Sequence, residues 1–538
     1  MKESSKLPIT KLFGNIEENF YQLGLKEAQQ AKSFYEHLSK FYKTSIGPID
    51  SVLENILKKV ISTWHHKDSN FSKLLMAYGQ GLGKEFDKLA LYISFPELMS
   101  TMSKWMPNVS PALFGCSSAF IWDEKNECPL HFRVFDYPMG KIYEDCERIL
   151  ITDFENSHKI MSLSLAAVPF SSITCMNDKG LSLALHQKFS EVFNLNGRSI
   201  FELNQIFMST VSSVEEAIEF LDQYRSITVW SMYCSFSDGR IMSIELCGEE
   251  NFYKVYDLKK QKTLYFNNLI ENENINSNCT PHGMISYCEM RNKNAEKKLK
   301  KILKKESISK TEILKILCSP QTTKKEFELD IITPTSLVSI LMDPKNQSAI
   351  YINSKAPKLY QGKMTELVDI FGKCEQKEIN KSFTNEKHIR YQDGMRDLMM
   401  AQYYRDEKDK TMAYHHLQMS IEKLNGESIG AVAKFFFLVE QYLNESNKII
   451  LSGISKELEE IRPSLTSYLQ DQANLFIARI EWTLYGKTKI SDEDINHEYL
   501  KSIYKIENKY SHNLVHKITK PFIKPRLDIL DILYFHHK

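Results

Sequence analysis

Two apolar segments, residues 116–122 and 128–135, stand on either side of the short polar sequence D-E-K-N. Apolar runs of this length around a polar turn predict a β-hairpin. The first arm begins with Cys116, and the second arm contains Arg133 and leads into Asp136. Because the arms of a hairpin run antiparallel, the start of the first lies beside the end of the second. The sequence therefore predicts that a thiol, a guanidinium and a carboxylate meet at one end of this hairpin.

These three groups together indicate a reactive thiol. A cation beside a thiol favours the thiolate, which is the reactive form, and a carboxylate holds and orients a neighbouring amine. Cleavage between Gly115 and Cys116 would give Cys116 a free α-amine, whose reference pKa of about 8 suits a base for its own side chain. The alternative interpretations are a buried core cysteine at 116, a surface arginine at 133 and a turn-forming aspartate at 136.

The order of these residues resembles a family of N-terminal-nucleophile (Ntn) hydrolases that act on linear amides. The groups in question are the acyl-coenzyme A:6-aminopenicillanic acid acyltransferase-like proteins and the related choloylglycine hydrolases and acid ceramidases. G-C-S-S at the first arm and R-x-x-D-Y-P at the second carry the resemblance. It covers roughly residues 10–360 and continues through C-M-N-D-K-G-L (175–181), S-D-G-R (237–240) with I-E (244–245), F-N-N (266–268) and S-Y-C-E-M-R (286–291).

The resemblance implies an α+β fold, the four-layer αββα sandwich of the Ntn hydrolases. Residues 1–115 would form a helical pro-segment or small subunit, and residues 116–372 the catalytic domain. The uncut chain would be a zymogen, activated by autocatalytic cleavage between Gly115 and Cys116. Cys116 would then be the nucleophile.

The resemblance also implies the rest of the catalytic set. Arg133 and Asp136 would support the nucleophile, while the Asn267 side chain and a backbone N–H near Asn177 would stabilise the oxyanion. Arg291 is the last member of this predicted set. For Asn177 the alternative is an ordinary hairpin turn, and for Arg291 a charged position at a helix start.

The pattern of expected elements agrees with two sheets between helices. Residues 1–110 have helical periodicity, and helices are expected near Ser199, after the capping-box sequence S-S-V-E (212–215) and at 284–304 and 309–318. Strands are predicted at 116–122, 128–135, 147–152, 159–166, 171–176, 181–186, 228–236, 240–246, 252–257, 262–267, 336–342 and 348–353. From about residue 375 helical stripes dominate, which predicts an all-α region over 373–538 and makes it the candidate surface for a protein partner.

Composition excludes several function classes. A net charge of +1 over 538 residues predicts no nucleic-acid partner. The ten cysteines lack zinc-type spacing, so we expect no metal, no cofactor and a reducing compartment. The N-terminus lacks the apolar core of a signal peptide, and no apolar run is long enough to form a transmembrane segment. We therefore expect a cytoplasmic protein, with export by another route left open.

Taken together, the sequence predicts an autoproteolytically activated cysteine amidohydrolase or acyltransferase. It would cleave or form a linear amide through a thioester acyl-enzyme, with a small-molecule acyl amide, or an acyl donor plus an amine acceptor, as substrate. Two alternatives stay open at this point. One is a non-catalytic binding protein that keeps the fold and docks a partner through its C-terminal helices, and the other is an enzyme whose main reaction is amide formation.

Overall fold

The computed structural model divides the chain into two compact units. The first consists of Met1–Pro281, Cys288–Ser319 and Ile331–Phe383, and the second of His282–Tyr287, Pro320–Asp330 and Thr384–Lys538. The residues that the structure describes are 6–40, scattered positions between 51 and 61, 69–97, 115–137, 140–190, 192–273, 275, 282–305, 307–319, 330–333, 335–353, 363–379 and 386–509.

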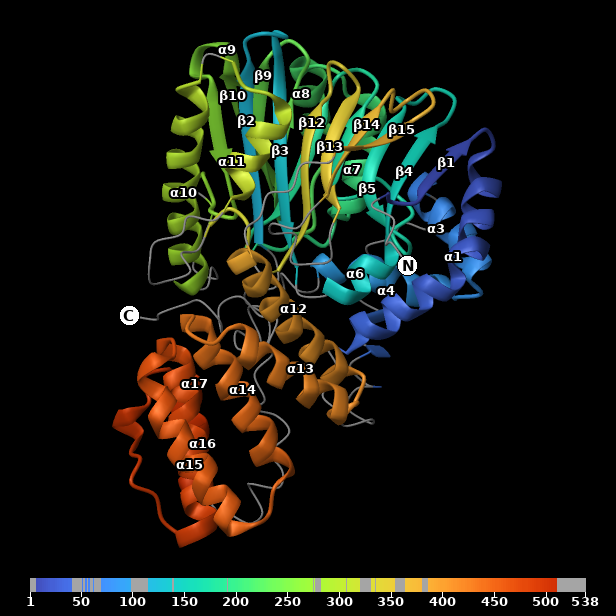
Figure 1. Cartoon of the computed structure of the whole chain (residues 1–538). Helices are drawn as coiled ribbons and strands as arrows, with labels where there is room; N and C mark the ends of the chain where they lie inside the picture. The colour runs from blue at the N-terminus through green and yellow to red at the C-terminus, as the bar shows by residue number, and fades with distance from the viewer. Residues whose placement is uncertain are drawn as a thin grey trace. The chain divides into compact units, whose positions relative to one another are not determined.

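The first unit contains two β-sheets (Figure 1). The eight-stranded sheet has, in spatial order, β1 (Ile9–Phe13), β4 (Glu147–Asp153), β5 (Ile160–Leu165), β6 (Thr174–Asn177), β7 (Ser182–Gln187), β8 (Val229–Ser235), β9 (Arg240–Cys247) and β10 (Glu250–Asp257). The seven-stranded sheet has β11 (Thr263–Phe266), β2 (Gly115–Asp123), β3 (Cys128–Asp136), β12 (Ser336–Asp343), β13 (Ser348–Asn353), β14 (Lys363–Val368) and β15 (Glu375–Ile379). All described pairs are antiparallel except β1 with β4.

Helices accompany both sheets, so the predicted mixed α+β class is confirmed. They are α1 (Ile16–Ser39), α3 (Asn70–Leu82), α4 (Phe86–Ile93), α6 (Gly140–Cys146), α7 (Ile200–Thr210), α8 (Val214–Gln223), α9 (Leu258–Gln261), α10 (His282–Leu303) and α11 (Lys310–Cys318). Strands β3 and β12 are buried along their whole length, which means that both of their faces are covered. The specific four-layer order of the Ntn sandwich stays a prediction.

Most predicted strands are present within a few residues, and three strands were not predicted. Strand β1 lies in a region expected to be helical, but its alternating burial is that of a strand, and it pairs parallel with β4. Five residues are too few for this alternation to stand out in the sequence. Strands β14 and β15 extend the second sheet to Ile379, beyond the expected start of the helical region.

The N-terminal segment is bonded to both sheets. Strand β1 forms the edge of the eight-stranded sheet. Just before it, the Leu7 backbone N–H donates to the hydroxyl of Tyr351 at 3.1 Å, and the Leu7 carbonyl accepts from Nε2 of Gln376 at 2.8 Å. These partners belong to β13 and β15 of the other sheet. Residues 6–13 are therefore an integral part of the first unit even though they lie far before Cys116 in sequence.

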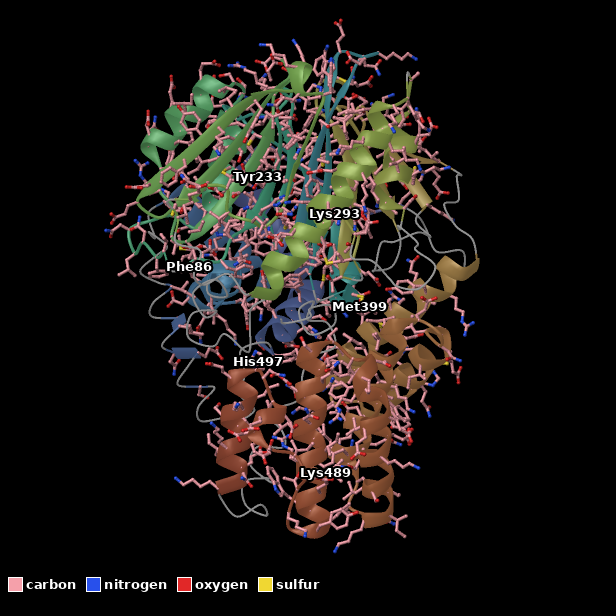
Figure 2. All side chains as sticks on the ribbon, turned by 90° about the vertical axis from the view of Figure 1, so that its left-hand side faces the viewer. Phe86, Tyr233, Lys293, Met399, Lys489 and His497 are labelled. Atoms are coloured by element: carbon pink, nitrogen blue, oxygen red, sulfur yellow. The ribbon has the colours of Figure 1, made fainter. Side chains whose placement is uncertain are left out.

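The second unit is helical in its described part after residue 384. Its helices are α12 (Glu386–Asp406), α13 (Lys410–Lys423), α14 (Ser428–Asn444), α15 (Lys448–Ile461), α16 (Ser467–Tyr485) and α17 (Glu498–Lys509), with 3-10 turns at Arg462–Ser464 and Asp492–Asp494. Figure 2 shows Met399, Lys489 and His497 in this unit. A buried ion pair between Arg479 and Glu507, with N···O distances of 2.9 and 2.6 Å, joins α16 to α17. The expected domain boundaries at 115/116 and 372/373 stay predictions.

The nine cysteines among the described residues are all buried and form no disulfide. Across the same part of the chain, no helix combines the length and the apolar character that crossing a bilayer requires.

Glu97 gives the fold a predicted pH dependence. It is buried, and its carboxylate accepts a 2.7 Å hydrogen bond from the backbone N–H of Ile200, the first residue of α7. Burial raises the pKa of Glu97 to about 7. A glutamate in an unfolded chain has a pKa of about 4.3, the value of a model peptide. Between these two pH values the unfolded state has already lost the proton that the folded state keeps, so folding stability falls as pH rises.

We therefore predict that Glu97→Gln stabilises the protein more at pH 8 than at pH 5. The amide keeps an acceptor for the N–H of Ile200 but carries no charge. The stabilisation at pH 8 should therefore exceed that at pH 5 by at most about 3 kcal/mol, close to the free energy that a pKa shift of this size represents. Melting temperatures at the two pH values measure it. The exposed Glu249→Gln serves as the control and should shift the melting temperature equally at both. An equal shift for Glu97→Gln as well would contradict the prediction.

Candidate active site

The β2–β3 hairpin brings the three predicted residues to one end of the second sheet. Its register pairs Gly115 with Asp136, Cys116 with Phe135 and Ser118 with Arg133. Cys116, Arg133 and Asp136 are all buried, the last two completely. The hairpin therefore places a thiol, a guanidinium and a carboxylate at the same buried end of the sheet, where electrostatic interactions are stronger than in water.

Arg133 contacts the thiol directly. Its Nη2 donates to Sγ of Cys116 at 3.0 Å and to the carbonyl of Leu185 at 2.8 Å. The same carbonyl lies 3.8 Å from the thiol. The guanidinium of Arg133 is therefore held directly against the Cys116 thiol.

The backbone nitrogen of Cys116 is held by Asn268. It donates to Oδ1 of Asn268 at 2.7 Å, and Nδ2 of Asn268 donates in turn to the carbonyl of Gln187 at 3.0 Å. The β2–β11 register pairs Ser118 with Phe266, and two further steps along it bring Asn268 level with Cys116. Asn268 is therefore the asparagine of F-N-N that reaches the nucleophile candidate.

The side chain of Asn267, which the sequence singled out, bonds elsewhere. Its Nδ2 donates to the carbonyl of Cys288 at 2.8 Å and to Oδ1 of Asn292 at 2.7 Å, and its Oδ1 accepts from the N–H of Leu269 at 3.0 Å. Neighbouring residues of an extended segment point to opposite sides, so Asn267 and Asn268 cannot share one task. Asn267 ties its segment to α10, next to the site.

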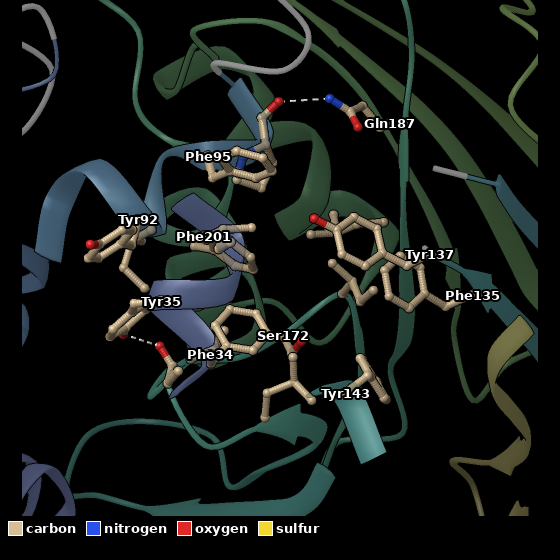
Figure 3. A pocket seen from close by; sticks show the side chains of 18 of the residues that line it. Phe34, Tyr35, Tyr92, Phe95, Phe135, Tyr137, Tyr143, Ser172, Gln187 and Phe201 are labelled. Carbon is tan, nitrogen blue, oxygen red and sulfur yellow. Dashed lines mark hydrogen bonds between the residues drawn. The ribbon is translucent and has the colours of Figure 1, made fainter. Parts of the chain in front are cut away.

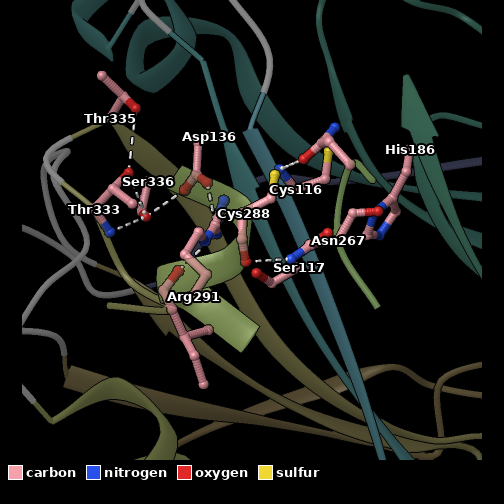
Figure 4. A network of polar contacts seen from close by, with 12 residues as sticks. Cys116, Ser117, Asp136, His186, Asn267, Cys288, Arg291, Thr333, Thr335 and Ser336 are labelled. Atoms are coloured by element: carbon pink, nitrogen blue, oxygen red, sulfur yellow. Dashed lines mark hydrogen bonds and ion pairs between the residues drawn. The ribbon is translucent and has the colours of Figure 1, made fainter. Parts of the chain in front are cut away.

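The carboxylate of Asp136 lies beside Gly115 rather than beside the thiol. Nη2 of Arg291 is 2.8 Å from Oδ2 of Asp136, and both side chains are fully buried (Figure 4). The Ser336 hydroxyl donates to Oδ1 at 2.5 Å. A Cβ atom at position 115 would come within 2.6 Å of Oδ2. Only glycine therefore fits next to this carboxylate, and the Gly115–Cys116 peptide bond runs directly past a buried ion pair.

Asn177 is not brought to Cys116. Its Nδ2 donates to the carbonyls of Met208 and Val211 at 3.1 and 2.9 Å, and its Oδ1 accepts from two N–H groups of the turn that follows. This turn precedes β7, whereas Cys116 contacts the far end of that strand. Its contacts are those of a turn residue that anchors α7, the alternative that the sequence left open.

Two buried residues of the site were missed at the sequence level, His186 and Lys188. Nε2 of His186 lies 2.9 Å from Nη1 of Arg133, and Lys188 Nζ donates to the carbonyl of Asn267 at 2.9 Å. Burial lowers the pKa of Lys188 and, together with the charge of Arg133, holds that of His186 well below its usual range. The available signal was the polar sequence H-Q-K at the end of an apolar strand.

Cys116 also forms part of the wall of an apolar pocket, which encloses about 820 Å³ including its solvent-open part (Figure 3). Hydrophobic and aromatic side chains are the usual lining of small-molecule pockets. Residues of α1, α4 and α6, of both sheets, of the connection between β5 and β6, and of α7 line it. The aromatic lining residues are Phe34, Tyr35, Tyr92, Phe95, Phe135, Tyr137, Tyr143, Phe201 and Trp230. A pocket of this kind accommodates an apolar group next to the thiol.

No protein-family model and no curated protein sequence matches the chain. Solved structures with some likeness include a Caenorhabditis elegans ortholog of N-acylethanolamine-hydrolyzing acid amidase, with 12% identity, coverage of 43% of this chain and 93% of that one, and a TM-score of 0.33. Penicillin V acylase from Agrobacterium tumefaciens has 13% identity, coverage of 50% and 93%, and a TM-score of 0.31. A mutant conjugated bile acid hydrolase from Clostridium perfringens has 12% identity, coverage of 50% and 98%, and a TM-score of 0.32. Values this low assign no family.

Proposed function

We propose that this protein is a cysteine amidohydrolase, activated by cleavage of its own chain, that acts on amides of apolar acyl groups. The observation that carries the proposal is the Cys116 thiol, which lies 3.0 Å from a buried guanidinium and in the wall of an apolar pocket. A cation fixed against a thiol favours the nucleophilic form. The pocket provides space for the acyl group of a substrate next to that nucleophile.

Activation would begin at the Gly115–Cys116 peptide bond. The Cys116 thiol adds to the carbonyl carbon of Gly115, the C–N bond breaks, and the nitrogen takes up the thiol proton. The resulting thioester is hydrolysed by water, which leaves a carboxylate on Gly115 and a free α-amine and thiol on Cys116. The buried Asp136–Arg291 pair beside Gly115 fixes the conformation of this peptide.

In turnover the free α-amine would act as the base. It takes the thiol proton as Sγ of Cys116 attacks the amide carbon, and returns that proton to the leaving amine. The bond between Cys116 N and Oδ1 of Asn268 would keep the α-amine in place. Water then hydrolyses the thioester, or an acceptor amine attacks it in the transfer reaction.

We assign the oxyanion role to the side-chain amide of Asn268. Asn267, the residue predicted from the sequence, already uses both N–H groups of its amide on Cys288 and Asn292, whereas Asn268 uses one of its two on the carbonyl of Gln187. Removal of one oxyanion donor typically lowers kcat by about 10²–10³-fold.

The N-terminal segment would stay bound after cleavage, because it forms part of the pocket. Phe34, Tyr35 and Tyr92 belong to its helices. The Tyr35 hydroxyl donates to the carbonyl of Ala167 at 2.5 Å, and Glu27 forms a buried ion pair with Arg148. Substrate binding would therefore need both fragments. The region 373–538 stays a candidate for docking a protein partner.

The test combines a denaturing gel with an amide series. We predict fragments 1–115 and 116–538 that separate only under denaturing conditions, with Cys116 as the N-terminal residue of the larger one. Among p-nitroanilide substrates, the decanoyl and phenylacetyl compounds should have a kcat/KM about 10²-fold higher than that of the charged succinyl compound. The physical reason is burial of the apolar acyl group, which contributes ~0.8 kcal/mol for each buried methylene of the decanoyl chain.

Three outcomes would contradict parts of the proposal. An intact chain with no turnover of any amide would favour the non-catalytic binding protein. An intact chain with full activity would exclude the α-amine as base. In the presence of candidate acceptor amines, a larger yield of the new amide than of the free acid would identify transfer as the main reaction.

A further inference from the structure

We propose that His186 is a positioning residue for Cys116, which holds the guanidinium of Arg133 against the thiol and couples it to the Asn267–Asn268 segment. The inference rests on the proposed function in one respect, namely that Cys116 is the nucleophile. It adds a residue that is absent from the catalytic set predicted from the sequence.

The imidazole lies at the centre of the site. His186 is fully buried in β7, one residue after Leu185, whose carbonyl accepts from Arg133. Its Nε2 lies 2.9 Å from Nη1 of Arg133 and 2.8 Å from Oγ of Ser118. The ring of Tyr233 packs edge-on against the imidazole, with centroids 4.6 Å apart and planes at 80°. These contacts from three strands fix the plane of the ring.

The contacts also determine the tautomer. A guanidinium has only donors, so Nε2 must present its lone pair to Arg133. The proton is then on Nδ1, which donates to the carbonyl of Asn267 at 3.2 Å. A second proton on the ring would set an N–H and a positive charge against Arg133. Burial, Arg133 and Lys188 accordingly lower the pKa of His186 well below its usual range, so the ring stays an acceptor near neutral pH.

Arg133 depends on this acceptor for its orientation. Among the described residues, its buried Nε has no hydrogen-bond partner, so its terminal nitrogens alone fix the guanidinium. Nη2 is shared between the Cys116 thiol and the Leu185 carbonyl, and Nη1 bonds to His186. Loss of the imidazole leaves Nη1 buried and unbonded. A buried donor without a partner is unfavourable, which favours rotation of the guanidinium away from the thiol.

His186 also connects the two ends of the site. The Asn267 carbonyl accepts from Nδ1 of His186 and from Nζ of Lys188. The next residue, Asn268, holds the nitrogen of Cys116. One imidazole therefore joins the cation at the thiol to the residue that orients the future α-amine.

The experiment measures the alkylation of Cys116 by iodoacetamide from pH 5 to 10, followed by mass spectrometry of the Cys116 peptide. In His186→Leu the pH of half-maximal rate should rise by one unit or more, and labelling at pH 7 should slow by about tenfold, as a loss of ~1.4 kcal/mol of thiolate stabilisation implies. His186→Gln, which retains an acceptor oxygen, should stay within about threefold of wild type. Ser118→Ala removes the other contact of Nε2 and leaves Arg133 in place. Its labelling rate at pH 7 should also stay within about threefold of wild type.

A folded His186→Leu protein with the wild-type profile would overturn the inference, and so would equal losses in the Leu and Gln variants. If His186→Leu does not fold, ¹⁵N shifts of labelled histidine in the wild type decide instead. These shifts should show the neutral Nδ1–H tautomer of His186 at pH 7, and a doubly protonated ring at this pH would overturn the inference. Neither readout uses a substrate, so failure of the proposed amidase function would be seen separately, as absence of turnover by the wild type.

Discussion

Replacement of Cys116 by alanine should abolish both chain cleavage and amide turnover, with kcat lower by about 10⁴-fold or more. The magnitude follows from the loss of a nucleophile, because the remaining groups of such a site retain only a small part of its rate enhancement. The variant should therefore run as a single intact chain on a denaturing gel, while the wild type runs as two fragments. Initial rates with the decanoyl anilide measure the second effect.

Cys175→Ala is the matched control for this variant. Cys175 is also a buried strand cysteine, but burial raises its pKa to about 11, so it stays a thiol near neutral pH. Its loss removes some packing and should leave cleavage and kcat within about threefold of wild type, as expected for a structural thiol. Comparable turnover by Cys116→Ala and the wild type would exclude Cys116 as the nucleophile.

Replacement of Asp136 by asparagine should destabilise the protein by about 3–5 kcal/mol, because it leaves the Arg291 charge buried without its counter-charge. Both side chains are fully buried, and 2.8 Å separates Nη2 of Arg291 from Oδ2 of Asp136. Chemical denaturation followed by circular dichroism measures the change. Since the carboxylate also borders Gly115, chain cleavage should slow at the same time.

Two further variants separate this effect from general damage. On the same helix as Arg291, Glu296 and Lys300 form an exposed pair with an N···O distance of 3.8 Å. Glu296→Gln should therefore change stability by less than about 1 kcal/mol. The double variant Asp136→Asn with Arg291→Met removes both buried charges and should recover much of the loss. A single Asp136→Asn variant as stable as Glu296→Gln would contradict the role given to the pair.

The parts of the site that the sequence predicted are the local ones. The hairpin that pairs Cys116 with the Arg133 segment needs only two apolar arms and a polar turn, and both are visible in a stretch of 21 residues, 116–136. Ser199 caps α7 close to the predicted helix start, and α8 begins with a capping box of Ser213 and Glu216, one residue after the predicted box of Ser212 and Glu215.

The missed parts depend on contacts between distant segments. Which asparagine of F-N-N reaches Cys116 depends on the register of a four-residue strand against β2, and a shift by one residue exchanges the two. His186 acquires its significance only because a different sheet brings Arg133 against it. Strand β1 pairs with a partner about 140 positions later, and no local pattern reports such a pairing.

Because the contacting segments lie far apart in sequence, the surroundings of the site form late during synthesis of the chain. Leu7 bonds to residues 344 and 369 positions later, and the Asp136 carboxylate beside Gly115 bonds to Ser336, 200 positions later. At about 5–20 residues per second, a ribosome needs roughly 20–70 s to pass from the first of these segments to its partners. The peptide bond before Cys116 therefore acquires its surroundings only when synthesis has passed Ser336. A nascent chain shorter than this holds an unassembled site, which would defer the proposed cleavage until the first unit, which ends at Phe383, is nearly complete.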